Sequence, residues 1–98
     1  MIVEYIRYAI PADRRESFER AYADAAPALD ASPHCLAYDL ARCAEDPTQF
    51  VLRIEWDSVG AHTEGFRGGA LFPEWRSHWG EYLDGTPDVQ HYQVIAGP

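Results

Sequence analysis

The sequence predicts a single α+β domain in which four strands form one antiparallel sheet and two helical regions cover one of its faces. Three observations support this prediction. The 98 residues suffice for only one hydrophobic core. Apolar residues make up 47% of the chain and aromatic residues 13%, enough to offset the conformational entropy lost on folding. Segments with strand character alternate with segments whose apolar residues recur at helical spacing.

The first strand and the first helix follow directly from residue types. Residues 2–10 are rich in β-branched and aromatic side chains and end at Pro11, which predicts a strand. Asp13 followed by Glu16 resembles a capping box, so we expect a helix to begin there. Pro27 should kink this helix or make it restart. Its apolar stripe consists of Phe18, Ala21, Tyr22, Ala25 and Leu29.

The middle of the chain predicts a β-hairpin. Residues 34–43 and 48–56 have strand character, and Glu45-Asp46-Pro47 forms the loop between them. In the second of these strands, bulky apolar side chains alternate strictly with smaller or charged ones. The bulky set is Phe50, Leu52, Ile54 and Trp56, and the other set is Val51, Arg53 and Glu55.

The last third of the chain predicts a second helical region and a final strand. Asp57 or Ser58 should cap a helical segment, which Gly68-Gly69 interrupts, and a stronger helix follows over residues 70–83. Its apolar stripe is Phe72, Trp75, Trp79, Tyr82 and Leu83. Residues 89–95 form the last strand. The order β-α-β-β-α-β is typical of the ferredoxin-like fold.

Sorting the strand residues by alternation predicts two unequal faces. The bulky face should lie under the helices and contains Ile6, Tyr8, Ile10, Leu36, Tyr38, Leu40, Phe50, Leu52, Ile54 and Trp56. The milder face contains Val3, Tyr5, Arg7, Cys35, Ala37, Asp39, Ala41, Val51, Arg53 and Glu55. A hairpin centred on Asp46 would place Asp39 opposite Arg53. Because the milder face is too apolar to be comfortable in water, we expect a homodimer that packs sheet on sheet, with a half-solvated monomer as the alternative.

The charge balance excludes several partners. The formal net charge is −8, all cationic side chains are Arg, and the chain has no Lys and no Asn. Such a chain is repelled by nucleic acid phosphates and by anionic membranes, so we expect neither as a partner. The apolar runs are far shorter than the ~20 residues of a membrane span, and the first residues have strand character instead of that of a signal peptide. We therefore expect a cytoplasmic protein with two free thiols, Cys35 and Cys43.

Several segments resemble the antibiotic biosynthesis monooxygenase (ABM) family. The motif Trp-x-Ser-x-x-Ala-His, common in that family between the third strand and the second helix, is present as Trp56-Asp-Ser-Val-Gly-Ala-His62. Ser32-Pro-His-Cys-Leu36 and His91-Tyr92 are also similar to the family. The resemblance covers nearly the whole chain. It implies a dimeric α+β barrel with a pocket between the helices and the sheet of each subunit.

The resemblance leaves the activity open. Some members oxidise polyketide-type aromatics with dioxygen and no metal or flavin, others degrade haem or isomerise small metabolites, and some have no known activity. This chain departs from the haem-degrading branch, which uses an Asn, because it contains none. A second His that many members carry at the start of the late helix is replaced here by the sequence Gly69-Ala70-Leu71-Phe72.

His62 is the candidate catalytic base, because it shares an apolar helix face with Val59 and Phe66 and its side chain titrates near neutrality. The candidate substrate-binding residues are Tyr8, Tyr38, Trp56, Phe66, Phe72, Trp75, His78 and Trp79. His34 is expected to stabilise a turn, and His91 could face either side of the sheet. The four scattered His residues and the two Cys predict no metal site, and no motif predicts a nucleotide cofactor.

We therefore expect a cofactor-independent monooxygenase that acts on a small hydrophobic aromatic molecule such as a quinol or a polyketide-like intermediate. The alternatives are a non-catalytic ligand-binding or accessory dimer of the same fold and, in last place, a haem-binding protein.

Overall fold

The chain forms the predicted ferredoxin-like α+β fold. The computed structural model of the chain describes residues 1–58, 60, 68–69, 71–82 and 88–97. The elements in order are β1 (Ile2–Ala9), α1 (Arg15–Asp30), β2 (Cys35–Arg42), β3 (Gln49–Trp56), α2 (Leu71–Trp79) and β4 (Asp88–Gln93). All strand pairs are antiparallel and the strand order is β2-β3-β1-β4. The helical segment predicted after Ser58 falls almost entirely on residues outside these ranges.

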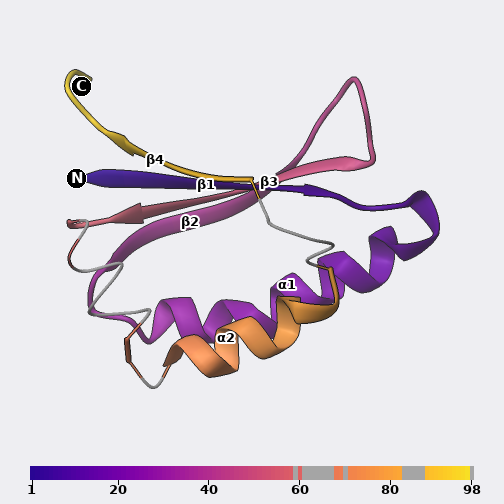
Figure 1. Cartoon of the computed structure of the whole chain (residues 1–98), viewed down its shortest axis with the longest axis horizontal. Helices are drawn as coiled ribbons and strands as arrows, with labels where there is room; N and C mark the ends of the chain where they lie inside the picture. The colour runs from indigo at the N-terminus through magenta and orange to yellow at the C-terminus, as the bar shows by residue number, and fades with distance from the viewer. Residues whose placement is uncertain (59, 61–67, 70, 83–87, 98) are drawn as a thin grey trace.

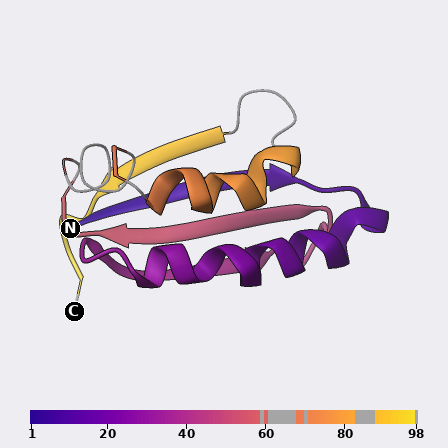
Figure 2. The ribbon, with the colours of Figure 1, turned by 90° about the horizontal axis from the view of Figure 1, so that it is seen from below.

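Both helices lie under one face of the sheet, and the opposite face carries no helix among the described elements (Figure 1). Seen from below, α1 and α2 lie side by side and run roughly along the strands (Figure 2). The hydrophobic core fills the space between these two layers. Its fully buried large side chains are Trp56, Phe18, Leu29, Leu52 and Ile54.

The alternation in β3 confirms the predicted faces. Phe50, Leu52, Ile54 and Trp56 are buried, whereas the residues between them are only partly buried. The predicted stripe of α1 packs on these side chains, since Phe18, Ala25 and Leu29 are buried and Ala21 and Tyr22 pack against the core. The predicted pairing of Asp39 with Arg53 is also present in the β2–β3 register.

The predicted start of α1 is wrong. A single turn of 3₁₀ helix, Ala12–Arg14, precedes the α-helix and contains Asp13. The N-cap of α1 is Arg14, without a side-chain capping bond, and the Ser17 hydroxyl donates to the Arg14 carbonyl at 2.9 Å. The helix also does not restart at Pro27, because that residue lies in its last turn and removes only one donor before the helix ends.

A bulge in β2 corrects the predicted position of two side chains. Cys35 pairs with Trp56 and Ala37 pairs with Glu55, so Leu36 is an extra residue with no partner in the register. Cys35 therefore lies on the helix-covered face, where it packs against the core. It does not lie on the opposite face of the sheet, which no described helix covers and which we call the open face (Figure 1). Leu36 is 56% exposed, so the prediction that it belongs to the core is wrong.

The open face holds a mixture of aromatic and charged groups. Tyr5 and Tyr92 form an edge-on ring pair at 5.4 Å, and Arg53 is bonded to Glu55 at 2.9 Å. A shallow hollow of about 450 Å³ is lined by Val3, Tyr5, Arg7, Arg53, Tyr92 and Val94. Strand β4 ends two residues earlier than predicted, and the following Ile95 is 93% exposed.

Candidate functional site

The helix-covered interior has two chemically different ends. Along β1 the inward side chains are Ile2, Glu4, Ile6 and Tyr8, which are all buried. Tyr8 pairs with Phe50 at one end of the sheet, and Ile2 pairs with Trp56 at the other. These two pairs are six residues apart, or roughly 20 Å along a strand. The side chains at these two ends are therefore too far apart to contact one another.

The end near Tyr8 is an aromatic core built around Phe18 of α1. The Phe18 ring is fully buried and lies 5.1 Å from the Tyr8 ring, 4.9 Å from the Phe50 ring and 5.2 Å from the Tyr82 ring. The Arg14 guanidinium lies 4.6 Å from the Tyr82 ring centre and closes the cluster from outside. Rings at these separations are in contact, so these side chains fill this end of the interior.

The other end contains a buried polar cluster. The Glu4 side chain is 3% exposed, and its Oε1 accepts a hydrogen bond from the Trp56 indole Nε1 at 3.1 Å. Its Oε2 lies 3.6 Å from Nε2 of His91, which is its direct partner across the β1–β4 register. The His91 side chain is 33% exposed. A carboxylate in the core thus contacts an imidazole that reaches solvent.

Sequence reasoning missed Glu4, although the signal was present. Glu4 stands at the same alternation as Ile6 and Tyr8, in a strand that is central in the sheet. A charged residue at such a position is rarely retained unless it is paired. Its pairing with His91 also determines which face His91 occupies, a question that the sequence left open.

Tyr8 and Trp56, both predicted to bind substrate, face the interior from opposite ends. Burial is the main cause that raises the pKa of the Tyr8 hydroxyl well above its ordinary value of 10, and the charge of Glu4 adds to it. The Tyr8 side chain therefore remains a neutral phenol at physiological pH. Trp56 is fully buried, and its indole nitrogen is committed to Glu4.

Tyr38 lies at the margin of the interior on β2. Its hydroxyl donates to the Asp30 carboxylate at 2.6 Å, a bond that raises the pKa of Tyr38 to about 12. The ring of Tyr22 lies 6.2 Å from that of Tyr38. Nearby, burial followed by the charge of Asp30 raises the pKa of the Cys35 thiol to about 11. Cys35 is therefore a packed thiol and a poor nucleophile.

Helix α2 carries the remaining predicted residues that the structure describes. Trp75 is 8% exposed and belongs to the core, and the Phe72 ring lies 6.0 Å from it. His78 is half-buried in the last turn. Trp79 is the last residue of α2, and its side chain is outside the described part of the chain. His62 and Phe66 also lie outside the described residues.

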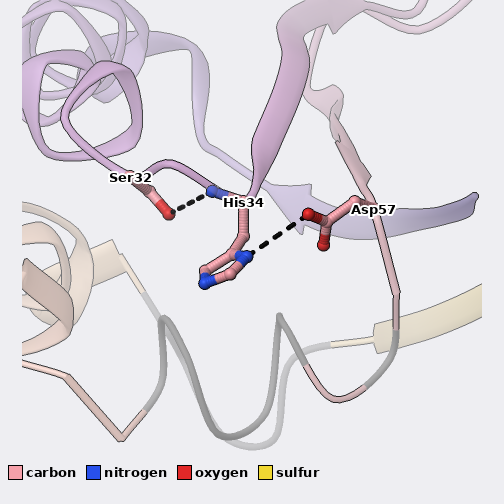
Figure 3. A network of polar contacts seen from close by, with 3 residues as sticks. All are labelled: Ser32, His34 and Asp57. Carbon is pink, nitrogen blue, oxygen red and sulfur yellow. Dashed lines mark hydrogen bonds and ion pairs between the residues drawn. The ribbon is translucent and has the colours of Figure 1, made fainter.

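A second histidine–carboxylate contact lies at the surface (Figure 3). His34 Nδ1 is 3.3 Å from Asp57 Oδ2, and the main-chain nitrogen of His34 donates to the Ser32 hydroxyl at 3.4 Å. Because Ser32 bonds to the main chain and not to the ring, these residues do not form a nucleophile relay of the serine hydrolase type. They tie the start of β2 to the end of β3.

Among residues 1–58, 60, 68–69, 71–82 and 88–97, no group of three or more His, Cys, Asp and Glu side chains could hold a metal ion. None of the described helices is long and apolar enough to span a membrane.

Comparison with known proteins gives consistent results. The sequence model of the family described as "Antibiotic biosynthesis monooxygenase" matches residues 1–78. The uncharacterized protein YczJ of Bacillus subtilis (strain 168) is 30% identical over 97% of this chain and 100% of its own length. A crystal structure of a proposed antibiotic biosynthesis monooxygenase from Bordetella bronchiseptica superposes with a TM-score of 0.85 at 32% identity, covering 97% of each chain. A structure from Nitrosomonas europaea with a similar description has a TM-score of 0.81 at 20% identity, covers 98% of this chain and 100% of its own, and shows the shared fold alone.

Proposed function

The chain belongs to the antibiotic biosynthesis monooxygenase family, and we propose that it is a cofactor-independent monooxygenase acting on a small hydrophobic aromatic molecule, such as a quinol or a polyketide-like intermediate. The observation that carries the proposal is the aromatic interior between sheet and helices, which combines apolar walls with a buried acid–base cluster at one end. An apolar site with a few convergent polar groups is the usual form of a small-molecule site.

The proposed reaction needs an electron-rich substrate and a base. Removing a proton from a phenol or from an adjacent methylene gives an anion that can donate an electron to dioxygen. Oxidation of a methylene to a carbonyl balances with one O₂, since one oxygen atom enters the product and the other leaves as water. The substrate supplies all the electrons, so the reaction requires no redox cofactor. A water-poor interior protects the reactive intermediate.

We assign the base to His62 and the walls of the site to aromatic residues. The proposed substrate-binding residues are Tyr8, Tyr38, Trp56, Phe66, Phe72, Trp75, His78 and Trp79. Trp56 and Trp75 both face the helix-covered interior, where the family resemblance places the pocket. The rings around Phe18 fill the end of the interior near Tyr8, so this packing argues against Tyr8 among these residues and favours a substrate at the end near Trp56.

We also propose that the protein is a cytoplasmic homodimer that packs its open sheet faces together. The open face presents Tyr92 and Val94, which are 46% and 39% exposed, beside the charged pair of Arg53 and Glu55. Paired charges within a chain are compatible with burial in an interface, whereas exposed aromatic and aliphatic groups favour it.

A non-catalytic ligand-binding or accessory dimer is the second candidate. The observation that favours it is the dense packing of the interior, where Phe18 is fully buried and Trp75 nearly so. Haem binding ranks below both candidates, and a haem titration without a shift of the Soret band would eliminate it.

The proposal is tested with metal-stripped protein and a panel of quinols, anthrones and related phenols. Each compound is mixed with protein anaerobically and then exposed to air, while oxygen uptake and product are followed. We expect oxygen-dependent turnover of at least one compound and a loss of about 10²-fold or more in kcat for His62→Ala. The control His34→Ala should retain activity. If no compound is turned over, the enzyme proposal fails, and if His62→Ala is fully active, the assignment of the base fails.

A further inference from the structure

The buried carboxylate of Glu4 belongs to the acid–base cluster described above, but the proposed reaction gives it no step of its own, and retaining it in the core is costly. Among the described residues it is the only charged side chain in the core. Its register partner on β3 is Ile54, and its same-face neighbours on β1 are Ile2 and Ile6. An apolar side chain at position 4 would match these neighbours, and replacing buried ionic groups by packed apolar ones is often neutral or stabilising. Its presence therefore points to chemistry in addition to packing.

The contacts of Glu4 define a path from the interior to solvent. Oε1 is held by the Trp56 indole at 3.1 Å, which fixes the orientation of the carboxylate. Oε2 faces His91 Nε2 at 3.6 Å, slightly longer than a hydrogen bond, so a small side-chain rotation or one bridging water connects them. Exposure rises from 3% at the Glu4 side chain to 33% at His91. One end of the pair is buried in the core and the other reaches solvent.

Tyr8 and Arg76 are titratable or charged groups of the described residues that lie around the same interior. Tyr8 is four residues after Glu4 on the same face of β1, and it is kept neutral by burial and by the charge of Glu4. The positive charge of Arg76 on α2 has the opposite effect and lowers the pKa of Tyr8, so this charge lies on the helix side of the interior. Trp56 can only donate.

We propose that Glu4 and His91 form a proton relay that carries the proton released from the substrate out of the interior. In this step the bond between the proton and the protonated base breaks as the Glu4 carboxylate gains an O–H bond. That O–H bond then breaks as the His91 imidazole gains an N–H bond, and His91 releases the proton to solvent water. No electrons are transferred. The source of the proton rests on the proposed function. The sharing of a proton between Glu4 and His91 is independent of that function.

The first test needs no substrate. The ring resonances of His91 are followed by NMR as a function of pH in the wild type and in Glu4→Gln, with His34 as an internal reference. A carboxylate neighbour favours the imidazolium, so His91 should titrate at a higher pH in the wild type than in Glu4→Gln. Equal titration midpoints for His91 in the two proteins would overturn the relay.

The second test uses turnover and a rescue that a structural role cannot show. In weak buffer, Glu4→Gln and His91→Gln should each lower kcat by about 10²-fold with KM changed less than about twofold. Added imidazole should restore part of the activity of His91→Gln, since a small base can replace an exposed relay end. His34→Gln is the matched control and should stay within twofold of the wild type. Unchanged kcat in both variants, or a loss in His91→Gln that imidazole does not rescue, would overturn the relay.

The two proposals can fail separately. If the wild type turns over no compound of the panel, the proposed function fails, and the NMR comparison decides alone whether the pair shares a proton. If Glu4→Gln does not fold, as shown by circular dichroism, His91→Gln takes its place, because His91 is partly exposed on an edge strand. The rescue by imidazole then decides the question.

Discussion

Phe18→Ala is expected to destabilise the protein by about 3–5 kcal/mol, the usual cost of removing a buried phenylalanine. Phe18 is 0% exposed and its ring contacts three other rings, from β1, β3 and the 3₁₀ turn Gly80–Tyr82 that follows α2. Removing it opens a cavity where three elements meet. Neighbouring rings held by separate elements cannot collapse into such a space without backbone movement, which places the cost in the upper part of this range.

Phe18→Leu separates the contribution of ring contacts from that of burial. Leucine retains most of the buried area but loses the three ring pairs, which contribute about 0.5–1.5 kcal/mol each beyond their area. Because leucine forms new contacts that offset part of this loss, we expect a cost of about 1–2 kcal/mol. Leu36→Ala, at a side chain that is 56% exposed, is the control and should change stability by less than about 0.5 kcal/mol.

The assay is urea unfolding followed by circular dichroism at a fixed protomer concentration, since the stability of the proposed dimer would depend on concentration. Thermal unfolding should show a fall of at least ~12 °C for Phe18→Ala, because 1 kcal/mol corresponds to about 4 °C or more in a domain of this size. A cost of less than about 1 kcal/mol would refute the conclusion that this end of the interior is solid core. It would then be open to a ligand.

Three further predictions concern other parts of the molecule. Asp30→Asn should lower the pKa of Tyr38 from about 12 toward 10, measured by tyrosine NMR. Because the folded-state pKa is the higher one, the bond to Asp30 stabilises the fold below pH 10, and this advantage should vanish between pH 10 and 12. In Cys43→Ser, the remaining Cys35 should react with iodoacetamide at pH 8 roughly 10- to 100-fold more slowly than a free thiol, since its pKa is about 11; a rate equal to that of glutathione would contradict this. Val51→Glu, on the open face, should give a folded monomer by analytical ultracentrifugation where the wild type is a dimer, and an unchanged dimer would refute the proposed interface.

Much of the fold could be predicted because one face of each strand is buried. In β3 the alternation of bulky and mixed residues is unambiguous, and it correctly assigned Phe50 and Trp56 to the core. The order of elements then left few topologies to consider. The structural relatives and the observed strand order confirm the prediction of a ferredoxin-like fold.

The bulge at Leu36 could not be predicted. Cys35 and Leu36 are both apolar, so either one satisfies the core by composition, and the sequence shows no Gly or Pro at the irregularity. The choice is made by the register with β3, where Trp56 pairs with Cys35. This is a long-range contact, which a local pattern does not contain.

The polar cluster of the candidate site was predictable only in part. The position of Glu4 among inward apolar residues is visible in the sequence, but its partners Trp56 and His91 are brought to it from β3 and β4.

The prediction of where α1 starts failed for a local reason. Pro11 favours the 3₁₀ turn that follows it, and this turn takes up Asp13 before the helix begins.

The origin of the oxygen atom in the product tests most directly whether the protein is a cofactor-independent monooxygenase. Metal-stripped protein is supplied with ¹⁸O₂ and a substrate from the panel, and the mass of the product is measured by mass spectrometry. We expect the reaction to incorporate one ¹⁸O atom per molecule of product without any added cofactor. Oxygen that comes from water, or turnover that requires an added metal or flavin, would contradict it.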